Sequence, residues 1–180
     1  LARDLSALYP NRTFVADVKS TGLYAVDTVL KANGATTDYW MTGHSHIKRR
    51  NHELGALAAF EKSGHFFFNA PIGRGYDDGL VSAIAVLRMM ERNPGKSLSQ
   101  LYAELPVTHA TLTMGPHCGD TIKYGVVDEL VARFTAMHAR GESVTGQKIV
   151  DVLTVNGVRF TTEDGTWGLI RASSNKPQLV

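Results

Sequence analysis

The first hundred residues alternate between two hydrophobic patterns. Short runs of β-branched and aromatic residues, typical of buried strands, are separated by stretches in which apolar residues recur every three or four positions, as in amphipathic helices. The pattern predicts strands over 13–18, 38–41, 56–60 and 66–68, and helices over 1–8, 23–32, 45–54, 79–92 and 97–105. Alternating strands and helices predict a layered α/β domain with a mixed sheet.

The helix over 79–92 carries a spaced set of apolar residues. Leu80, Ile84, Leu87 and Met90 recur at helical spacing, so we expect them or nearby residues to face inward. Asp77 or Asp78 can cap the start of this helix.

The pattern changes near Pro106. Beyond this proline it predicts a strand over 108–114, a helix over 122–140, a loop over 141–147 and strands over 149–155, 158–161 and 167–171. The dipeptides Asn156-Gly157 and Asp164-Gly165 are typical of the tight turns that join antiparallel strands. This order predicts a small α+β domain, which we expect to be truncated because the chain ends within an apolar stretch.

Composition narrows the class of protein. Hydrophobic residues make up 43% of the chain and charged residues 20%, as in ordinary globular proteins. No apolar run approaches the ~18 residues of a membrane span, and the single cysteine, Cys118, is typical of a reducing compartment. The net charge of +2 does not favour nucleic acid. We therefore expect a cytoplasmic protein with no nucleic-acid or membrane partner.

Polar side chains follow the predicted strands, where open α/β sheets tend to place binding groups. Lys19 follows the first strand and can meet a phosphate or a hydroxyl group. His44 follows the second strand, next to Gly43, and can donate, accept or transfer a proton near neutral pH. His44 and His46 could instead form a metal site, but no third ligand stands at a recognisable spacing.

Two further clusters combine groups suited to sugars and phosphates. The turn over 61–65 carries Glu61, Ser63 and His65, and we expect it to be exposed. A carboxylate such as that of Glu61 can bind a sugar, because its oxygens accept hydrogen bonds from neighbouring sugar hydroxyls. After the last strand come Arg171, Ser173, Ser174 and Asn175, and arginine forms paired hydrogen bonds to phosphate. Each cluster, taken alone, could also be an ordinary solvated loop.

In order along the chain, five strings resemble the α-D-phosphohexomutase family, in particular its bacterial phosphomannomutase/phosphoglucomutase members. They are DVKST at 17–21, TGHSHIK at 42–48, EKSGH at 61–65, DDG at 77–79 and WGLIRASSNKP at 167–177. The resemblance implies an isomerase that moves a phosphoryl group between O1 and O6 of mannose or glucose. Its partners would be the 1- and 6-phosphates of these hexoses and a bisphosphate intermediate.

The resemblance also implies a division into domains and a role for each site residue. Residues 1–10 would be the tail of domain two, 11–105 the sugar-recognising domain three, and 106–180 part of domain four. Lys19, His44 and His65 would line the reacting centre as catalytic residues, Glu61 and Ser63 would bind sugar hydroxyls, and Arg171, Ser173, Ser174 and Asn175 would bind phosphate. Many relatives read RASNT where this chain has Ser174-Asn175, and both replacements keep hydrogen-bonding groups.

Two loops of the family do not occur in this sequence: the phosphoserine loop and the DGDxDR loop that holds Mg²⁺. The resemblance therefore implies a fragment of a magnesium-dependent phosphoprotein, with no metal ligands of its own and no activity alone. The alternatives are a glucosamine- or N-acetylglucosamine-phosphate mutase and a non-catalytic phosphosugar-binding module. We further expect the candidate residues of both domains to face one open space, and a loosely held phosphate loop beside an unpaired sheet edge.

Overall fold

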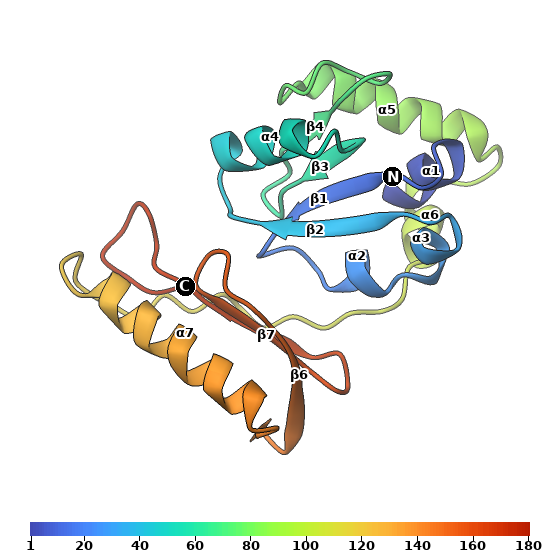
Figure 1. Cartoon of the computed structure of the whole chain (residues 1–180). Coiled ribbons are helices and arrows are strands. Elements are labelled where there is room, and N and C mark those ends of the chain that lie inside the picture. The colour runs from blue at the N-terminus through green and yellow to red at the C-terminus, as the bar shows by residue number, and fades with distance from the viewer. The chain divides into compact units, whose positions relative to one another are not determined.

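The computed structural model describes all 180 residues, which form two compact units, Leu1–His109 and Ala110–Val180 (Figure 1). Each unit has a four-stranded sheet of its own. The prediction of a mixed-sheet layered α/β domain followed by a small α+β domain is confirmed. None of the helices combines the length and the apolar composition that crossing a bilayer requires.

A mixed sheet with strand order β2-β1-β3-β4 forms the centre of the first unit. β1 (Thr13–Asp17) pairs in parallel with β2 (Thr36–Trp40) and β3 (Ala58–Phe60), and β4 (Phe66–Phe68) pairs antiparallel with β3. β1 and β3 lie in the middle of the sheet and are almost fully buried, which explains their continuous apolar runs.

Six helices surround this sheet: α1 (Ala2–Leu8), α2 (Leu23–Val26), α3 (Thr28–Ala32), α4 (His44–Glu53), α5 (Gly79–Arg92) and α6 (Leu98–Ala103). Both faces of the sheet contribute to the core, because successive side chains of a strand point to opposite faces. On one face Phe14 and Phe68 pack with Leu5, and on the other face Val15 packs with Ile47.

The helix predicted over 23–32 is two short helices, because Asp27 interrupts it. This residue has extended backbone angles (φ −57°, ψ 124°), and its side chain accepts hydrogen bonds from the N–H groups of Val29 and Leu30. An N-cap aspartate satisfies the free N–H groups at the start of a helix. One side chain thus ends α2 and begins α3, which an apolar periodicity does not reveal.

The inward face of α5 also differs from the prediction. The helix begins after its Asp78 cap as expected. However, Leu80, Ile84 and Leu87 are 71%, 43% and 61% exposed, whereas Ala85 and Met89 are buried. Apolar residues occupy both sides of this helix, so spacing alone does not identify which of them face inward.

The second unit is an antiparallel sheet with order β5-β6-β7-β8 and one long helix, α7 (Lys123–Ala139). The strands are β5 (Ser143–Val144), β6 (Gln147–Leu153), β7 (Val158–Thr162) and β8 (Trp167–Ile170). The strand predicted over 108–114 is wrong: these residues have no regular structure, and Leu112 is 91% exposed. Their β-branched composition suits a strand, but no neighbouring strand pairs with them.

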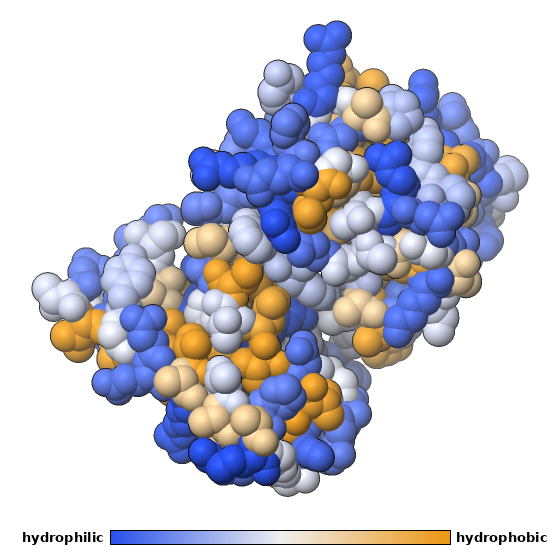
Figure 2. Space-filling view, in the orientation of Figure 1, coloured by the Kyte–Doolittle hydropathy of each residue, from blue (hydrophilic) through white to orange (hydrophobic).

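The core of the second unit is small. α7 packs on β6 and β7, where Phe134 stacks on Phe160 with 4.7 Å between ring centroids. The buried hydrophobic residues here are Cys118, Val127, Ile149 and Val158. Much apolar surface therefore stays accessible, and Figure 2 shows a broad hydrophobic area on this unit.

Candidate functional site

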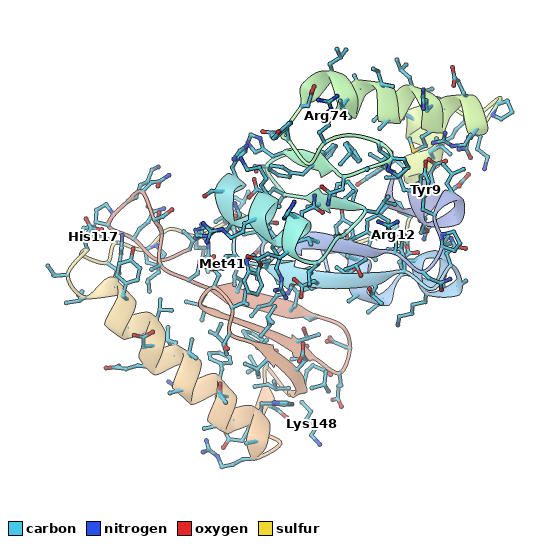
Figure 3. The ribbon with its side chains drawn as sticks, turned by 45° about the horizontal axis from the view of Figure 1, so that its top comes forward. Tyr9, Arg12, Met41, Arg74, His117 and Lys148 are labelled. Carbon is cyan, nitrogen blue, oxygen red and sulfur yellow. The ribbon has the colours of Figure 1, made fainter.

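Three polar loops leave the sheet of the first unit at the same edge. They follow β1, β2 and β3, whose parallel directions bring their carboxyl ends together. The first loop carries Lys19. The second loop leads to His44, the first residue of α4, and the third is the turn over 61–65. In Figure 3, Met41 marks this end of the sheet and Arg12 the opposite end.

A buried carboxylate, Asp17, joins these three loops. The residue has no exposed surface. Its Oδ1 accepts hydrogen bonds from Ser20 Oγ (2.6 Å) and the Lys62 N–H (3.2 Å), and its Oδ2 accepts one from Thr42 Oγ1 (3.1 Å). Lys19 Nζ lies 3.8 Å from Oδ2. Because a buried carboxylate needs partners in fixed places, Asp17 sets the loops relative to one another.

Glu61, expected on an exposed turn, is buried, with 5% of its surface exposed. Its Oε1 accepts a hydrogen bond from the N–H of Gly43 at 2.8 Å. Gly43 has φ 129°, a conformation that favours glycine and here aims its N–H at the carboxylate. The expectation of exposure was wrong because the turn packs against the loop after β2, a contact between segments far apart in sequence.

The two predicted histidines lie together beside a carboxylate. The ring centroids of His44 and His65 are 6.3 Å apart, edge to face. His65 Nδ1 lies 2.7 Å from Asp77 Oδ2, and His44 Nε2 lies 3.8 Å from the same oxygen. Both histidine side chains are 49% exposed and that of Asp77 is 25% exposed. Water and a ligand can therefore reach both imidazoles.

Sequence reasoning did not place Asp77 in the site. It treated Asp77 and Asp78 as equivalent helix caps, but the side chain of Asp78 alone accepts from the first N–H groups of α5. Asp77 instead forms a backbone bridge with Phe67 of β4, which brings its carboxylate to His65. The repeated aspartate was the available signal, because one helix start needs one cap.

The remaining sugar-site residue, Ser63, is exposed at the tip of the turn, next to Gly64 with φ 90°. The structure thus gathers five of the predicted residues at one sheet edge: Lys19, His44, Glu61, Ser63 and His65. Arg171 belongs to the second unit, and the expectation that all candidate residues face one space stays a prediction.

The predicted phosphate loop, 171–175, is closed by a return of the chain. Arg171 and Val180 exchange both backbone hydrogen bonds, at 2.9 and 2.8 Å. We expected a loosely held loop, and the structure differs because residues 177–180 fold back along it.

A buried lysine at the start of α7 holds the same loop. Lys123 is 3% exposed, and its Nζ donates to the carbonyl oxygens of Ser173 (2.6 Å) and Lys176 (3.2 Å) and to Asp120 Oδ1 (2.6 Å). These acceptors offset the cost of burying an ammonium group. Sequence reasoning placed Lys123 in an amphipathic helix and missed this role, since nothing in the periodicity marks the residue as buried.

The groups that this loop offers differ in exposure. Ser173 is 8% exposed, whereas Ser174 and Asn175 are exposed. Arg171 is half-buried, and its Nη1 donates to the carbonyl oxygen of Ala172 at 3.2 Å. A guanidinium, hydroxyl groups and an amide on one closed loop are suited to binding phosphate.

These loops contain no candidate metal site, and a groove elsewhere in the first unit does not include the predicted site residues. The 180 residues contain no group of three or more His, Cys, Asp or Glu side chains that could hold a metal ion. The side chains of this chain therefore do not fit Mg²⁺. A groove of about 850 Å³ between α1, α3 and α6 is lined by residues such as Tyr24 and Tyr102, and none of the predicted site residues lines it.

A mixed-sheet domain with lysine, histidine and glutamate loops at its strand ends, followed by a small unit with an arginine-serine loop, is the arrangement that the resemblance to the phosphohexomutases implies. The model of phosphoglucomutase/phosphomannomutase, alpha/beta/alpha domain III, matches residues 1–109. The chain therefore belongs to the phosphoglucomutase/phosphomannomutase family.

Several relatives match nearly the whole chain. It is 30% identical over 179 residues to a phosphomannomutase/phosphoglucomutase of Pseudomonas putida (99% of this chain, 35% of that protein). It is 33% identical over 181 residues to a phosphoglucomutase of Neisseria meningitidis serogroup A (99% and 36%). A solved phosphoglucomutase/phosphomannomutase family protein of Burkholderia thailandensis matches with TM-score 0.73 at 28% identity (99% and 34%). The chain thus spans about a third of the length of these relatives.

Proposed function

We propose that this chain is the sugar- and phosphate-binding part of a phosphomannomutase/phosphoglucomutase, an isomerase that interconverts hexose 1-phosphates and 6-phosphates. The observation that carries the proposal is the meeting of three polar loops on the buried Asp17, which places Lys19, the two histidines and Glu61 at one sheet edge. The relatives in Pseudomonas and Neisseria, a phosphomannomutase/phosphoglucomutase and a phosphoglucomutase, support the same activity.

We assign residues 11–105 to domain three of the full-length enzyme, 106–180 to part of domain four and 1–10 to the tail of domain two. The family model for domain III ends at residue 109, and the two compact units divide after His109, which supports a boundary close to residue 105.

Glu61 and Ser63 bind the sugar in this proposal. The N–H of Gly43 donates to Oε1 of Glu61, so in this proposal Oε2 is the oxygen that accepts hydrogen bonds from sugar hydroxyls, and the exposed Ser63 adds a hydroxyl. Mannose and glucose differ at C2 and share the arrangement at C3 and C4. A carboxylate that binds O3 and O4 therefore accepts both sugars.

Positive and proton-carrying groups serve the phosphates. Lys19, His44 and His65 line the end of the sugar where the phosphoryl group moves, and the loop from Arg171 to Asn175 binds the phosphate that stays on the sugar. Mg²⁺ and the phosphoserine belong to other parts of the full-length enzyme, so the chain alone does not turn over.

The proposed partners are mannose and glucose 1- and 6-phosphates and the bisphosphate intermediate. The expected absence of nucleic-acid and membrane partners and the cytoplasmic location stay predictions.

Assays of the full-length protein with glucose, mannose and glucosamine 1-phosphates test the proposal. Glu61→Gln is compared with Glu53→Gln, which changes a half-exposed glutamate at the end of α4. Hydrogen bonds to a charged group are worth about 1.5–3 kcal/mol, so we expect Glu61→Gln to lower kcat/KM for both hexose phosphates by about tenfold or more. Equal activity of the two variants, or turnover of glucosamine 1-phosphate alone, would contradict the proposal.

A further inference from the structure

All three N–H donors of the Lys123 ammonium group are used within the protein. A lysine ammonium has three donors and no acceptor, and the three acceptors here are the carbonyl oxygens of Ser173 and Lys176 and Oδ1 of Asp120. The side chain of Lys123 is 3% exposed. A phosphate therefore cannot reach Nζ, and Lys123 can influence a ligand only through the groups that it holds.

The hydrogen bond to Ser173 fixes the direction of a peptide unit. In a trans peptide the C=O and the following N–H lie in one plane and point in opposite directions. Because the carbonyl oxygen of Ser173 points to the buried Nζ at 2.6 Å, the N–H of Ser174 points away from it. Ser174 is exposed, and its N–H donates to no other group of the chain. The loop therefore presents one unpaired backbone donor to the solvent.

We propose that Lys123 is a positioning residue that turns the peptide between residues 173 and 174 so that the N–H of Ser174 donates to a phosphate oxygen. Backbone N–H groups that converge on a concavity bind anions, and a donor to an ionised oxygen forms one of the stronger hydrogen bonds. The step is binding alone, and no covalent bond changes. The phosphate ligand rests on the proposed function, whereas the direction of the peptide does not.

Other contacts hold Ser173 in place on the near side of this peptide. The N–H of Ser173 donates to the carbonyl oxygen of Gln178 at 3.0 Å, and its Oγ accepts from the N–H of Asn175 at 3.4 Å. Ser173 is thus held at its N–H, its C=O and its side chain. A donor that is already directed outward needs little ordering when the anion binds.

The second carbonyl bond of Lys123 has a different consequence. Lys176 is followed by Pro177, which has no N–H. The hydrogen bond from Nζ to the carbonyl oxygen of Lys176 therefore presents no further donor and holds the far end of the loop. Ser174 is the amide whose direction Lys123 sets.

A role through charge alone can be separated from a role through position. Asp120, whose side chain is 68% exposed, pairs with the ammonium group, so each charge can be removed separately. Lys123→Met removes the positive charge and the donor. Asp120→Asn removes the negative charge, and its amide oxygen can still accept from Nζ. The double variant keeps the net charge of the wild type and lacks the donor to Ser173.

Titration of the chain with inorganic phosphate, followed by amide spectra, tests the positioning role. We expect the Ser174 amide proton to shift downfield in the wild type, in Asp120→Asn and in Lys148→Met, which removes an exposed charge of β6. In Lys123→Met and in the double variant we expect this shift to be lost and the Kd for phosphate to rise about fivefold or more, because the peptide is free to turn. Wild-type binding by the double variant would show that charge alone acts and would overturn the inference.

The direction of the peptide is tested in the wild type without phosphate, so the result stands even if Lys123→Met fails to fold. We expect couplings across the hydrogen bonds from Lys123 Nζ to the carbonyl carbons of Ser173 and Lys176. Absence of the coupling to Ser173, or a phosphate titration that shifts other amides at 171–175 and spares Ser174, would overturn the inference. Couplings together with no phosphate shift anywhere at 171–175 would contradict the proposed function, while the direction of the peptide would stand.

Discussion

The two units fix their binding loops with buried charges of opposite sign. In the first unit the Asp17 carboxylate collects hydroxyl and N–H donors from three loops. In the second unit the Lys123 ammonium collects carbonyl oxygens from one loop. In both units a buried charge needs hydrogen-bonding partners, and these partners hold an irregular backbone in a defined shape.

The sign of each charge also suits the proposed ligand. Lys123 places a positive charge beneath the loop proposed to bind phosphate, and a low-dielectric setting increases its attraction for an anion. Asp17 lies beneath the loops proposed to bind the sugar, where it is partnered by Lys19. The two units also differ in the size of their hydrophobic cores, since most of the buried hydrophobic residues belong to the first unit.

The largest effect is expected from Asp17→Ala. It leaves the donors of Ser20, Thr42 and Lys62 without their acceptor, and breaking a buried charged network costs about 3–5 kcal/mol. Hydrogen exchange of amides in the loops at 42–48 and 61–65 should accelerate more than that of β1. A variant with unchanged unfolding free energy and unchanged exchange would show that Asp17 does not organise the loops.

Lys123→Met should have the next largest effect, a loss of about 2–3 kcal/mol in the unfolding free energy of the second unit, because the carbonyl oxygens of Ser173 and Lys176 lose a charged donor. The matched control is Lys148→Met, at an exposed position of β6. Each unit should be followed by its own resonances, since two units need not unfold together. Equal stability of the two variants would contradict the role of Lys123.

Glu61→Gln is expected to cost less in stability, about 1–2 kcal/mol, because the amide oxygen can still accept from Gly43. Glu61 is buried, so some loss of melting temperature should accompany the loss of sugar recognition. A loss of recognition with no change in melting temperature would mean that the Gly43 bond does not stabilise the turn.

The smallest effect concerns pH and Asp27. Burial alone would raise the pKa of Asp27, but the hydrogen bond from Arg3 and those from the N–H groups of Leu30 and Val29 outweigh it and hold the pKa below its usual value. A lowered pKa in the folded state contributes stability above the unfolded-state pKa near 4 and loses it as pH falls below that value. Asp27→Asn should therefore weaken the acid dependence of unfolding, and an unchanged dependence would contradict this assignment.

The sequence predicts those parts of the fold that depend on local pattern. The apolar runs of β1 and β3 and the loops after them could be placed because buried parallel strands read as continuous hydrophobic segments. The break at Asp27, the inward face of α5 and the burial of Glu61 could not, because each depends on contacts between distant segments. The same limit hid Asp17, Asp77 and Lys123: a charged residue at a strand end or a helix start is typical of solvent exposure until its partners are known.

Titration of the chain with glucose 1-phosphate, glucose and inorganic phosphate, followed by amide shifts, tests the central claim most directly. We expect glucose 1-phosphate to bind with a Kd no tighter than about 1 mM, or roughly −4 kcal/mol, and to shift amides at 42–48, 61–65 and 171–175. Glucose should affect the first two segments, and phosphate the last. Micromolar binding, isomerisation by the chain alone, or shifts confined to the groove beside Tyr24 and Tyr102 would contradict the account.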